Sequence, residues 1–272
     1  MARYHQETLL ILTKTYPSPS RKHREISCVA ALNQNGEMRR LFPLPFRLLD
    51  GEQQFQRWEW IKGHITKAQD DHRPESYKVD IDSIERIQKL GTSQGWAERM
   101  GWIAPLFLPD FASLETRRQT TGQTLGFIRP ADFTLEIKPS GSPDWTPEEQ
   151  TKLIQDGLFD STEIKSRFPL RKVPFDFYYL YTCQTQASHS RHKHKLTDWE
   201  VSALYWNCQR DYGESWEKYF RLRLEADFSR KKEIAFLMGT MHRFPDLWLI
   251  VGLIYPPKSA ARQQAFLLPP NG

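Results

Sequence analysis

The chain has 272 residues, of which 39% are hydrophobic and 13% aromatic, and it carries a formal net charge of +5. This composition excludes a disordered chain, because it supplies enough apolar side chains for globular cores. No apolar run approaches the roughly 20 residues that span a bilayer, and the first residues lack the apolar stretch of a secretion signal. We therefore expect a cytoplasmic protein of two domains, whose mild positive charge favours an anionic partner.

Closely spaced strand patterns fill the first 90 residues. Asn35-Gly36 is the dipeptide best suited to a tight hairpin turn, and it separates two apolar runs. Five short strands within about 80 residues fit a small barrel. Alternation and turn residues predict these five strands at 8–15, 26–32, 38–42, 55–65 and 77–87.

Helices and strands both occur in the remaining chain. Thr146-Pro147 has the chemistry of a helix start, and Asp198 is placed to cap a second helix. We expect helices at 94–107, from 146, at 197–212 and at 214–228, and strands at 124–128, 133–137, 173–183, 234–238 and 247–255. The fold class is therefore mixed, β-rich α+β. The expected domains are 1–140, a linker with a short helix at 141–165, and 166–272.

The two ends of the chain share a short pattern. Tyr16-Pro17 and Tyr255-Pro256 each follow an apolar strand. Either the chain holds a duplicated barrel, or the two strands simply stop at the same dipeptide, as strands often do.

The run HSRHKHK at 189–195 is the densest basic segment of the chain. We expect a loop there, with three alternatives: a solvated surface, a phosphate-contacting loop, or a zinc site. A thiolate and imidazole nitrogens suit zinc, and the ligands would be Cys183, His189, His192 and His194.

A second loop, DDHRPES at 70–76, combines carboxylates with an imidazole and a guanidinium. Asp71 and Glu75 could serve metal-dependent phosphodiester chemistry, which needs paired acids. Alternatively, Arg73 pairs with one of these acids in a turn fixed by Pro74. The sequence has no phosphate-binding loop, dinucleotide fingerprint or serine nucleophile elbow.

Basic residues lie among aromatic ones along several predicted strands, and this combination holds single strands by phosphate contacts and base stacking. An ordinary core with solvated arginines is the alternative. The candidate nucleic-acid-binding residues are Lys14, Tyr16, Arg21, Lys22, Arg24, Arg39, Arg40, Arg57, Trp58, Arg73, Arg191, His192, Lys193, His194 and Lys195.

Several motifs in the same order resemble the bacterial and archaeal dual OB-containing domain proteins. They are LTKTYPSPSRKHREISCVAAL, RRLFPLPFRLL, QFQRWEWI, DDHRPES, FYYLYTC, HKHKLTDWE and LWLIVGLIYPP, and they extend over nearly the whole chain. The resemblance implies two OB-like small β-barrels in tandem with added helices, and a nucleic-acid role, in conflict with phages or mobile elements. The resemblance implies no catalytic residues in this chain.

Three functions follow from these patterns. The first is a module that binds single-stranded DNA or RNA without catalysis and without a cofactor. The second is a metal-dependent nuclease or phosphoryl-transfer enzyme that uses Asp71 and Glu75 or the 189–194 tract. The third is an adaptor that binds another protein through its many aromatic residues.

Overall fold

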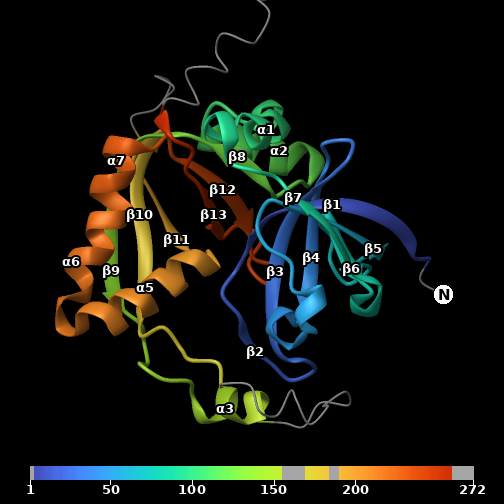
Figure 1. The fold of residues 1–272 in the computed structure, drawn as a ribbon, viewed down its shortest axis with the longest axis horizontal. Coiled ribbons are helices and arrows are strands. Elements are labelled where there is room, and N and C mark those ends of the chain that lie inside the picture. The colour runs from blue at the N-terminus through green and yellow to red at the C-terminus, as the bar shows by residue number, and fades with distance from the viewer. Residues whose placement is uncertain (1–2, 155–168, 184–189, 259–272) are drawn as a thin grey trace, which may run out of the picture.

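The computed structural model describes residues 3–154, 169–183 and 190–258. These residues form two sheets with helices packed around them (Figure 1). The first sheet contains β1 (His5–Lys14), β2 (Ser18–Ser20), β3 (Arg24–Asn33), β4 (Met38–Leu44), β5 (Glu59–Lys67), β6 (Ser76–Val79) and β7 (Glu85–Lys89).

Five strands of the first sheet close into a ring. The strand order is β1, β3, β4, β6 and β5, and β5 pairs again with β1. All neighbours are antiparallel except β4 and β6, which run parallel. The mixed α+β fold class with an OB-like barrel is therefore confirmed for this half.

The β3–β4 hairpin forms at the expected turn. Leu32 pairs with Met38, and Gly36 has a φ of 77°, a left-handed conformation that glycine adopts without a steric penalty. The asparagine and glycine of this turn thus help to set the register of β3 against β4.

The expected strand at 77–87 is instead two strands. A short 3-10 turn, Ile81–Ser83, separates β6 from β7, and the Asp80 side chain accepts a hydrogen bond from the backbone N–H of Asp82. Asp and Ser side chains compete with strand pairing by bonding to the nearby backbone. The alternation of apolar residues continues across the turn, which concealed the break.

The second sheet has six strands in the order β8, β12, β13, β11, β10, β9. Only Arg129 separates β8 from β9 in the chain, although these two strands form opposite edges of the sheet. The strands are β8 (Gly126–Ile128), β9 (Pro130–Pro139), β10 (Phe175–Cys183), β11 (His192–Leu196), β12 (Ala235–Thr240) and β13 (Trp248–Ile254).

Taken as one bent strand, β8 and β9 give the second sheet the connectivity of the first barrel. Counted along the chain, β8–β9 is then the first strand, β10 the second, β11 the third, β12 the fourth and β13 the fifth. Around the sheet the order is first, second, third, fifth, fourth and back to the first, as it is for β1, β3, β4, β6 and β5. The third and fifth strands, β11 and β13, again run parallel, like β4 and β6. Both sheets are therefore OB-like barrels with added helices.

Helices lie along one side of the second barrel and at one end of the interface between the two (Figure 1). Thr146 caps its helix by accepting a hydrogen bond from the N–H of Glu149, whose carboxylate accepts one from the N–H of Thr146. Asp198 caps the next through the N–H of Glu200. The helices are α1 (Ser93–Ile103), α2 (Phe111–Thr121), α3 (Pro147–Ile154), α5 (Trp199–Tyr212), α6 (Trp216–Arg221), a π-helical turn (Leu222–Asp227) and α7 (Phe228–Lys231). No helix among the described residues is long and apolar enough to cross a membrane.

The chain passes from the first sheet to the second between β7 and β8. This change comes before the linker expected at 141–165, so that β8 and β9, expected in the N-terminal half, belong to the second barrel. The linker region itself contains α3, which packs near β2 and β3 at the bottom of Figure 1.

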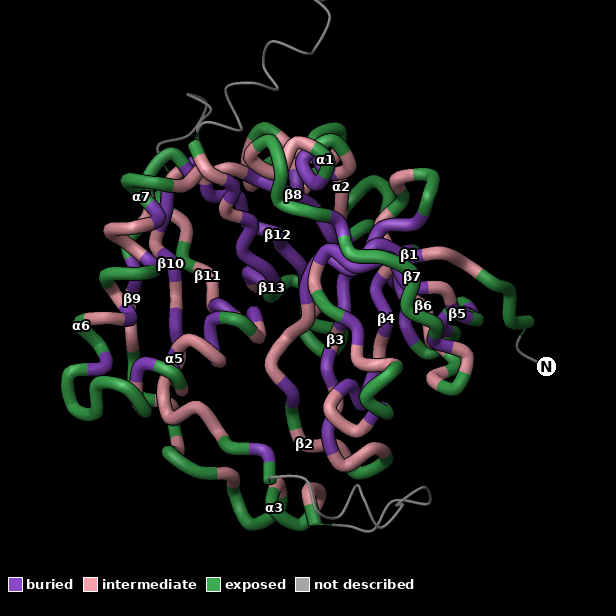
Figure 2. Tube along the Cα trace, in the orientation of Figure 1, coloured by how far each residue is buried: buried purple, intermediate pink, exposed green. Residues whose placement is uncertain are grey.

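A shared apolar cluster joins the two barrels. β1 is buried on both faces: Leu9 and Ile11 face the interior of the first barrel, whereas Leu10 and Leu12 pack with residues of the second such as Val251. The buried segments in Figure 2 accordingly continue through the middle of the molecule. Burial of apolar surface on both sides of β1 holds the barrels together.

A close backbone contact at this interface gives a direct test. The Thr13 hydroxyl donates a hydrogen bond of 3.1 Å to the carbonyl of Val251, and a Cβ on Gly252 would lie 2.8–2.9 Å from three Thr13 side-chain atoms. We expect Gly252→Ala to lower the free energy of unfolding by about 1–3 kcal/mol through overpacking. Urea unfolding measures the loss. Gly51→Ala, where a Cβ meets no atom within 4 Å, is the control, and an equal effect of both changes would contradict the contact.

Candidate functional site

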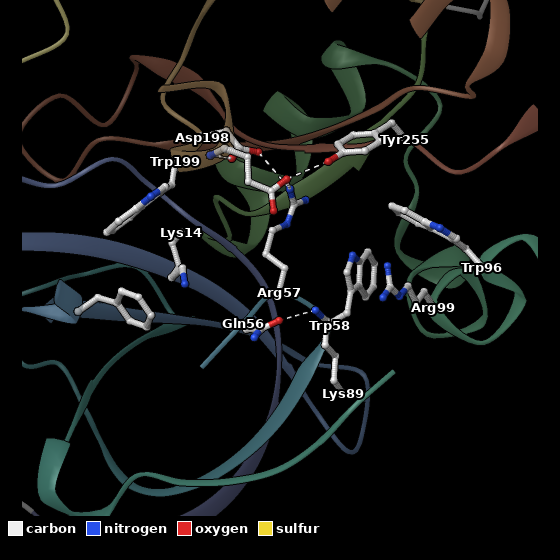
Figure 3. Close-up of a pocket in the computed structure, with 12 residues that line it drawn as sticks. Lys14, Gln56, Arg57, Trp58, Lys89, Trp96, Arg99, Asp198, Trp199 and Tyr255 are labelled. Atoms are coloured by element: carbon white, nitrogen blue, oxygen red, sulfur yellow. Dashed lines mark hydrogen bonds and ion pairs between the residues drawn. The ribbon is translucent and has the colours of Figure 1, made fainter. Parts of the chain in front are cut away.

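A cleft of about 380 Å³ opens between the two barrels (Figure 3). Its walls come from the end of β1, the segments before β5 and after β13, the end of β7, and helices α1 and α5. The lining residues are Lys14, Phe46, Gln56, Arg57, Trp58, Lys89, Trp96, Arg99, Asp198, Trp199, Glu200 and Tyr255.

Two tryptophans of the cleft stand on left-handed backbone. Trp58 has a φ of 62° and Trp96 a φ of 74°, and such conformations cost a bulky residue about 1–3 kcal/mol. Their rings meet edge to face with centroids 6.0 Å apart, and the Arg99 guanidinium lies 4.7 Å from the Trp96 ring centroid. Strain of this kind concentrates at functional sites, so the half-buried Trp96 ring is a candidate ligand platform, with the buried Trp58 ring behind it.

Three cationic side chains besides Arg57 line the cleft. The Lys14 ammonium lies 3.5 Å from the Phe46 ring centroid and donates to the carbonyl of Phe55. Burial lowers the pKa of Lys14 to about 8, although nearby carboxylates oppose the shift. Arg99 donates to the carbonyl of Leu90, and Lys89 is exposed at the end of β7. The cleft therefore holds several cationic groups.

Two carboxylates, Asp198 and Glu200, form another part of the cleft wall, and Figure 3 shows Asp198 near Arg57 and Lys14. Arg57 donates to Glu200 at 2.5 Å and lies 3.6 Å from Asp198, and the hydroxyl of Tyr255 donates to Glu200 at 2.9 Å. Burial raises the pKa of Asp198 to about 6, against the opposing effect of Arg57. Perturbed pKa values on both an acid and a base of one cleft are typical of functional sites.

Arg57 also fixes the position of the barrels relative to each other. It donates to the carbonyl of Leu12 on β1 at 2.8 Å and to that of Leu253 on β13 at 2.7 Å. Its side chain is only 9% exposed. The arginine expected to meet a phosphate is thus largely engaged in holding the wall of the cleft.

A second cavity, of about 280 Å³, adjoins the first and shares Asp198, Glu200 and Tyr255 with it. It extends along α5 to Arg223 and Leu224 in the π-helical turn. The carboxylate wall therefore has space on both sides.

Among the residues expected to bind nucleic acid, Lys14, Arg57 and Trp58 meet in the cleft, whereas two other arginines are buried away from it. Arg40 donates to the Thr124 hydroxyl and lies 3.6 Å from Glu75. Arg73 donates to Asp71 and to the carbonyl of Thr240. Because these side chains are enclosed and paired, they stabilise the fold.

Several other candidates lie outside the cleft, and among them Arg39 is half-buried. Arg21 pairs with Glu148, Arg39 with Glu7 and Glu37. Lys22 and Arg191 are exposed.

Two further candidates bond to backbone carbonyls. The Tyr16 hydroxyl donates to Arg171, and Arg24 donates to Leu153. The Tyr16 ring packs edge to face on Trp199 of the cleft.

The basic tract forms a strand where we expected a loop. β11 begins at His192 and pairs with β10. His192 and His194 turn inward and pack on Phe111, whereas Lys193 pairs with Glu136 and Lys195 with Asp176 on neighbouring strands. The alternation of imidazole and ammonium therefore matches the two faces of a strand.

The zinc ligands expected near this tract include His189, which lies outside the described residues. Burial raises the pKa of the Cys183 thiol, which disfavours the thiolate that binds zinc. Within the described part of the chain, the one group of three or more clustered metal-binding side chains is Asp71, His72 and His242.

His194 predicts a loss of stability in acid. Burial, together with the neighbouring His192, lowers the pKa of His194 to about 4, and its Nδ1 lies 3.0 Å from the Tyr181 hydroxyl. The imidazole of an unfolded chain has a pKa of about 6.5, so between these values the unfolded state binds more protons, and the free energy of unfolding falls as the pH is lowered from about 6.5 to about 4. We expect a loss on the order of 2–3 kcal/mol across this range, measured by urea unfolding. His194→Gln should flatten the slope and His64→Gln, on an exposed residue, should not; equal slopes would contradict the assignment.

Two family models match the chain, and the residues that they match agree with the division into two barrels. A family model described as "Domain of unknown function (DUF8757)" matches residues 111–271. The chain belongs to the DUF8757 family. A second model, "Domain of unknown function (DUF8758)", matches residues 5–105, so two adjacent domains cover the chain and the expected tandem arrangement is confirmed.

The DUF8757 region contains the second barrel, and no curated protein matches the chain. A solved structure entitled "Structure and Conformational Change of a Replication Protein A Heterotrimer Bound to ssDNA" is similar at 8% identity and a TM-score of 0.27. That likeness covers 98% of this chain and 68% of the other. The cleft takes Trp199 and Tyr255 from the DUF8757 region, and Lys14 and Trp96 from the other.

Proposed function

We propose that the chain binds single-stranded nucleic acid, DNA or RNA, and that one base enters the cleft between the barrels. The observation that carries the proposal is the pairing of tryptophan rings with cationic side chains in one space. Aromatic rings and a cationic groove together hold single strands without requiring a defined sequence. The resemblance to dual OB-containing domain proteins is consistent with this role.

The dimensions of the cleft favour a single nucleotide. A volume of about 380 Å³ is at the small end of ligand pockets. A base would stack on Trp96, while Lys14, Lys89 and Arg99 would neutralise nearby phosphates. The carboxylate of Glu200, which is partly exposed, can accept a hydrogen bond from an exocyclic amino group, as acidic residues do from cytosine.

Titration of fluorescently labelled oligonucleotides tests the proposal by anisotropy. Three phosphate contacts predict that the logarithm of the binding constant falls with that of the salt concentration with a slope of about −2. A mononucleotide in excess should compete for the cleft and quench tryptophan fluorescence. An absence of binding at low salt, for both DNA and RNA, would refute the proposal.

A further inference from the structure

Three side chains with metal-binding atoms meet where the two barrels come together, and none of them lines the cleft. Asp71 and His72 belong to the loop between β5 and β6, and His242 belongs to the turn between β12 and β13. Their ligand atoms all lie within 4.8 Å of one another. The two segments are far apart in the sequence and come from different barrels.

The distances resemble one part of a tetrahedral zinc site. Oδ1 of Asp71 lies 3.5 Å from Nδ1 of His242, and bonds of about 2.0–2.1 Å to zinc place two tetrahedral ligands roughly 3.4 Å apart. The rings of His72 and His242 have centroids 6.1 Å apart. Because both imidazoles are exposed, their side chains can turn to bring ligand atoms that already lie within 4.8 Å of one another to the spacing of a three-ligand site.

Arg73 holds the carboxylate in position. Its Nε and Nη2 donate to Asp71 at 2.9 and 2.6 Å, and its Nη1 donates to the carbonyl of Thr240 at 2.6 Å, two residues before His242. Although burial raises it, these hydrogen bonds hold the pKa of Asp71 well below its usual range. Groups that hydrogen-bond a ligand in this way orient it for the metal.

The ligand types select the class of ion. Mg²⁺ and Ca²⁺ require several oxygen ligands, whereas imidazole suits zinc and neighbouring transition metals. One carboxylate, already paired with Arg73, and two imidazoles offer little negative charge to a hard cation. The donor set therefore favours a transition metal with water in the remaining position.

We propose that Asp71, His72 and His242 bind a divalent transition-metal ion, zinc being the best match, and that the ion fastens the first barrel to the β12–β13 turn. The site shares no residue with the cleft. It stands whether or not the cleft binds nucleic acid.

Competition between the chelator-treated full chain and a chromophoric zinc chelator tests the proposal. We expect the wild type to bind one zinc ion at this site. Combining His72→Ala and His242→Ala should lower the affinity for that ion by roughly tenfold or more. The Tm should rise with zinc in the wild type, not in the double variant, and magnesium should leave it unchanged. His64→Ala, which removes another exposed histidine, should behave as the wild type.

Two results would overturn the site. The first is a wild type that shows neither zinc binding nor a rise in Tm. The second is a double variant with unchanged zinc affinity, which would place the ion elsewhere, for example at the histidines of β11. Since the replaced imidazoles are exposed, the variant should fold, and circular dichroism verifies this before titration.

Discussion

Replacing Arg57 with methionine is expected to lower the free energy of unfolding by about 3–5 kcal/mol. The change leaves the carboxylates of Asp198 and Glu200 without their cation and the carbonyls of Leu12 and Leu253 without their donor. Removing one partner of a buried ion pair costs this much because the other charge remains desolvated. Urea unfolding followed by circular dichroism measures the effect.

Arg21→Met is the matched control for this change. Arg21 pairs with Glu148, but the two side chains are 77% and 67% exposed, and such pairs contribute about 1 kcal/mol or less. If the free energy of unfolding falls only slightly in both variants, Arg57 does not stabilise the contact between the barrels. Because domains are stable by only about 5–15 kcal/mol, the expected loss leaves a marginal fold.

Combined Trp96→Ala and Trp199→Ala changes are expected to weaken oligonucleotide binding by about 5- to 150-fold. This range corresponds to the loss of about 1–3 kcal/mol of base stacking. Both side chains are only partly buried, so the change removes ring surface that a ligand could contact. Anisotropy titration at one fixed salt concentration measures the loss, and the salt dependence should persist because the cations remain.

Tyr212→Ala is the control for the tryptophan variant. Tyr212 is 45% exposed and stacks on Tyr219 with centroids 3.6 Å apart, and it lines neither cavity. We expect its removal to leave affinity unchanged. If the tyrosine change weakens binding as much as the tryptophan pair, nucleic acid does not stack in the cleft.

Local chemistry allowed much of the fold to be predicted. The turn at Asn35-Gly36 and the caps at Thr146 and Asp198 depend on neighbours within a few residues, and each forms as expected. β11 was missed because its inward residues are His192 and His194. Buried imidazoles with lowered pKa act as apolar residues, but in sequence they resemble charge.

The site was predictable only in part, because long-range contacts decide which cations are free. Arg40, Arg57 and Arg73 look like surface cations, yet their partners include residues 84, 196 and 167 positions away. Trp96 gives no sequence signal of its left-handed backbone, which bulky residues rarely adopt. Composition could therefore indicate that cationic and aromatic side chains form the cleft, but not which residues line it.

The apparent repeat at Tyr16 and Tyr255 does not align the barrels. Tyr16 follows β1, the first strand of one ring, and Tyr255 follows β13, the fifth strand of the other. The shared strand order, with its parallel third and fifth strands, is the stronger sign of a common plan. The repeated dipeptide marks only where two strands stop.

The bent β8–β9 strand imposes an order on folding during synthesis. Phe127 on β8 pairs with Leu237 on β12, and closure of that ring also needs β13, so the ribosome must have made almost all of the described chain first. The first ring needs nothing beyond β6. Pairings this distant in sequence form slowly, and until they form, the outer face of β1 with Leu10 and Leu12 lacks its cover. The nascent chain therefore exposes an aggregation-prone apolar surface on β1 for most of its translation. A chaperone would be needed during this interval.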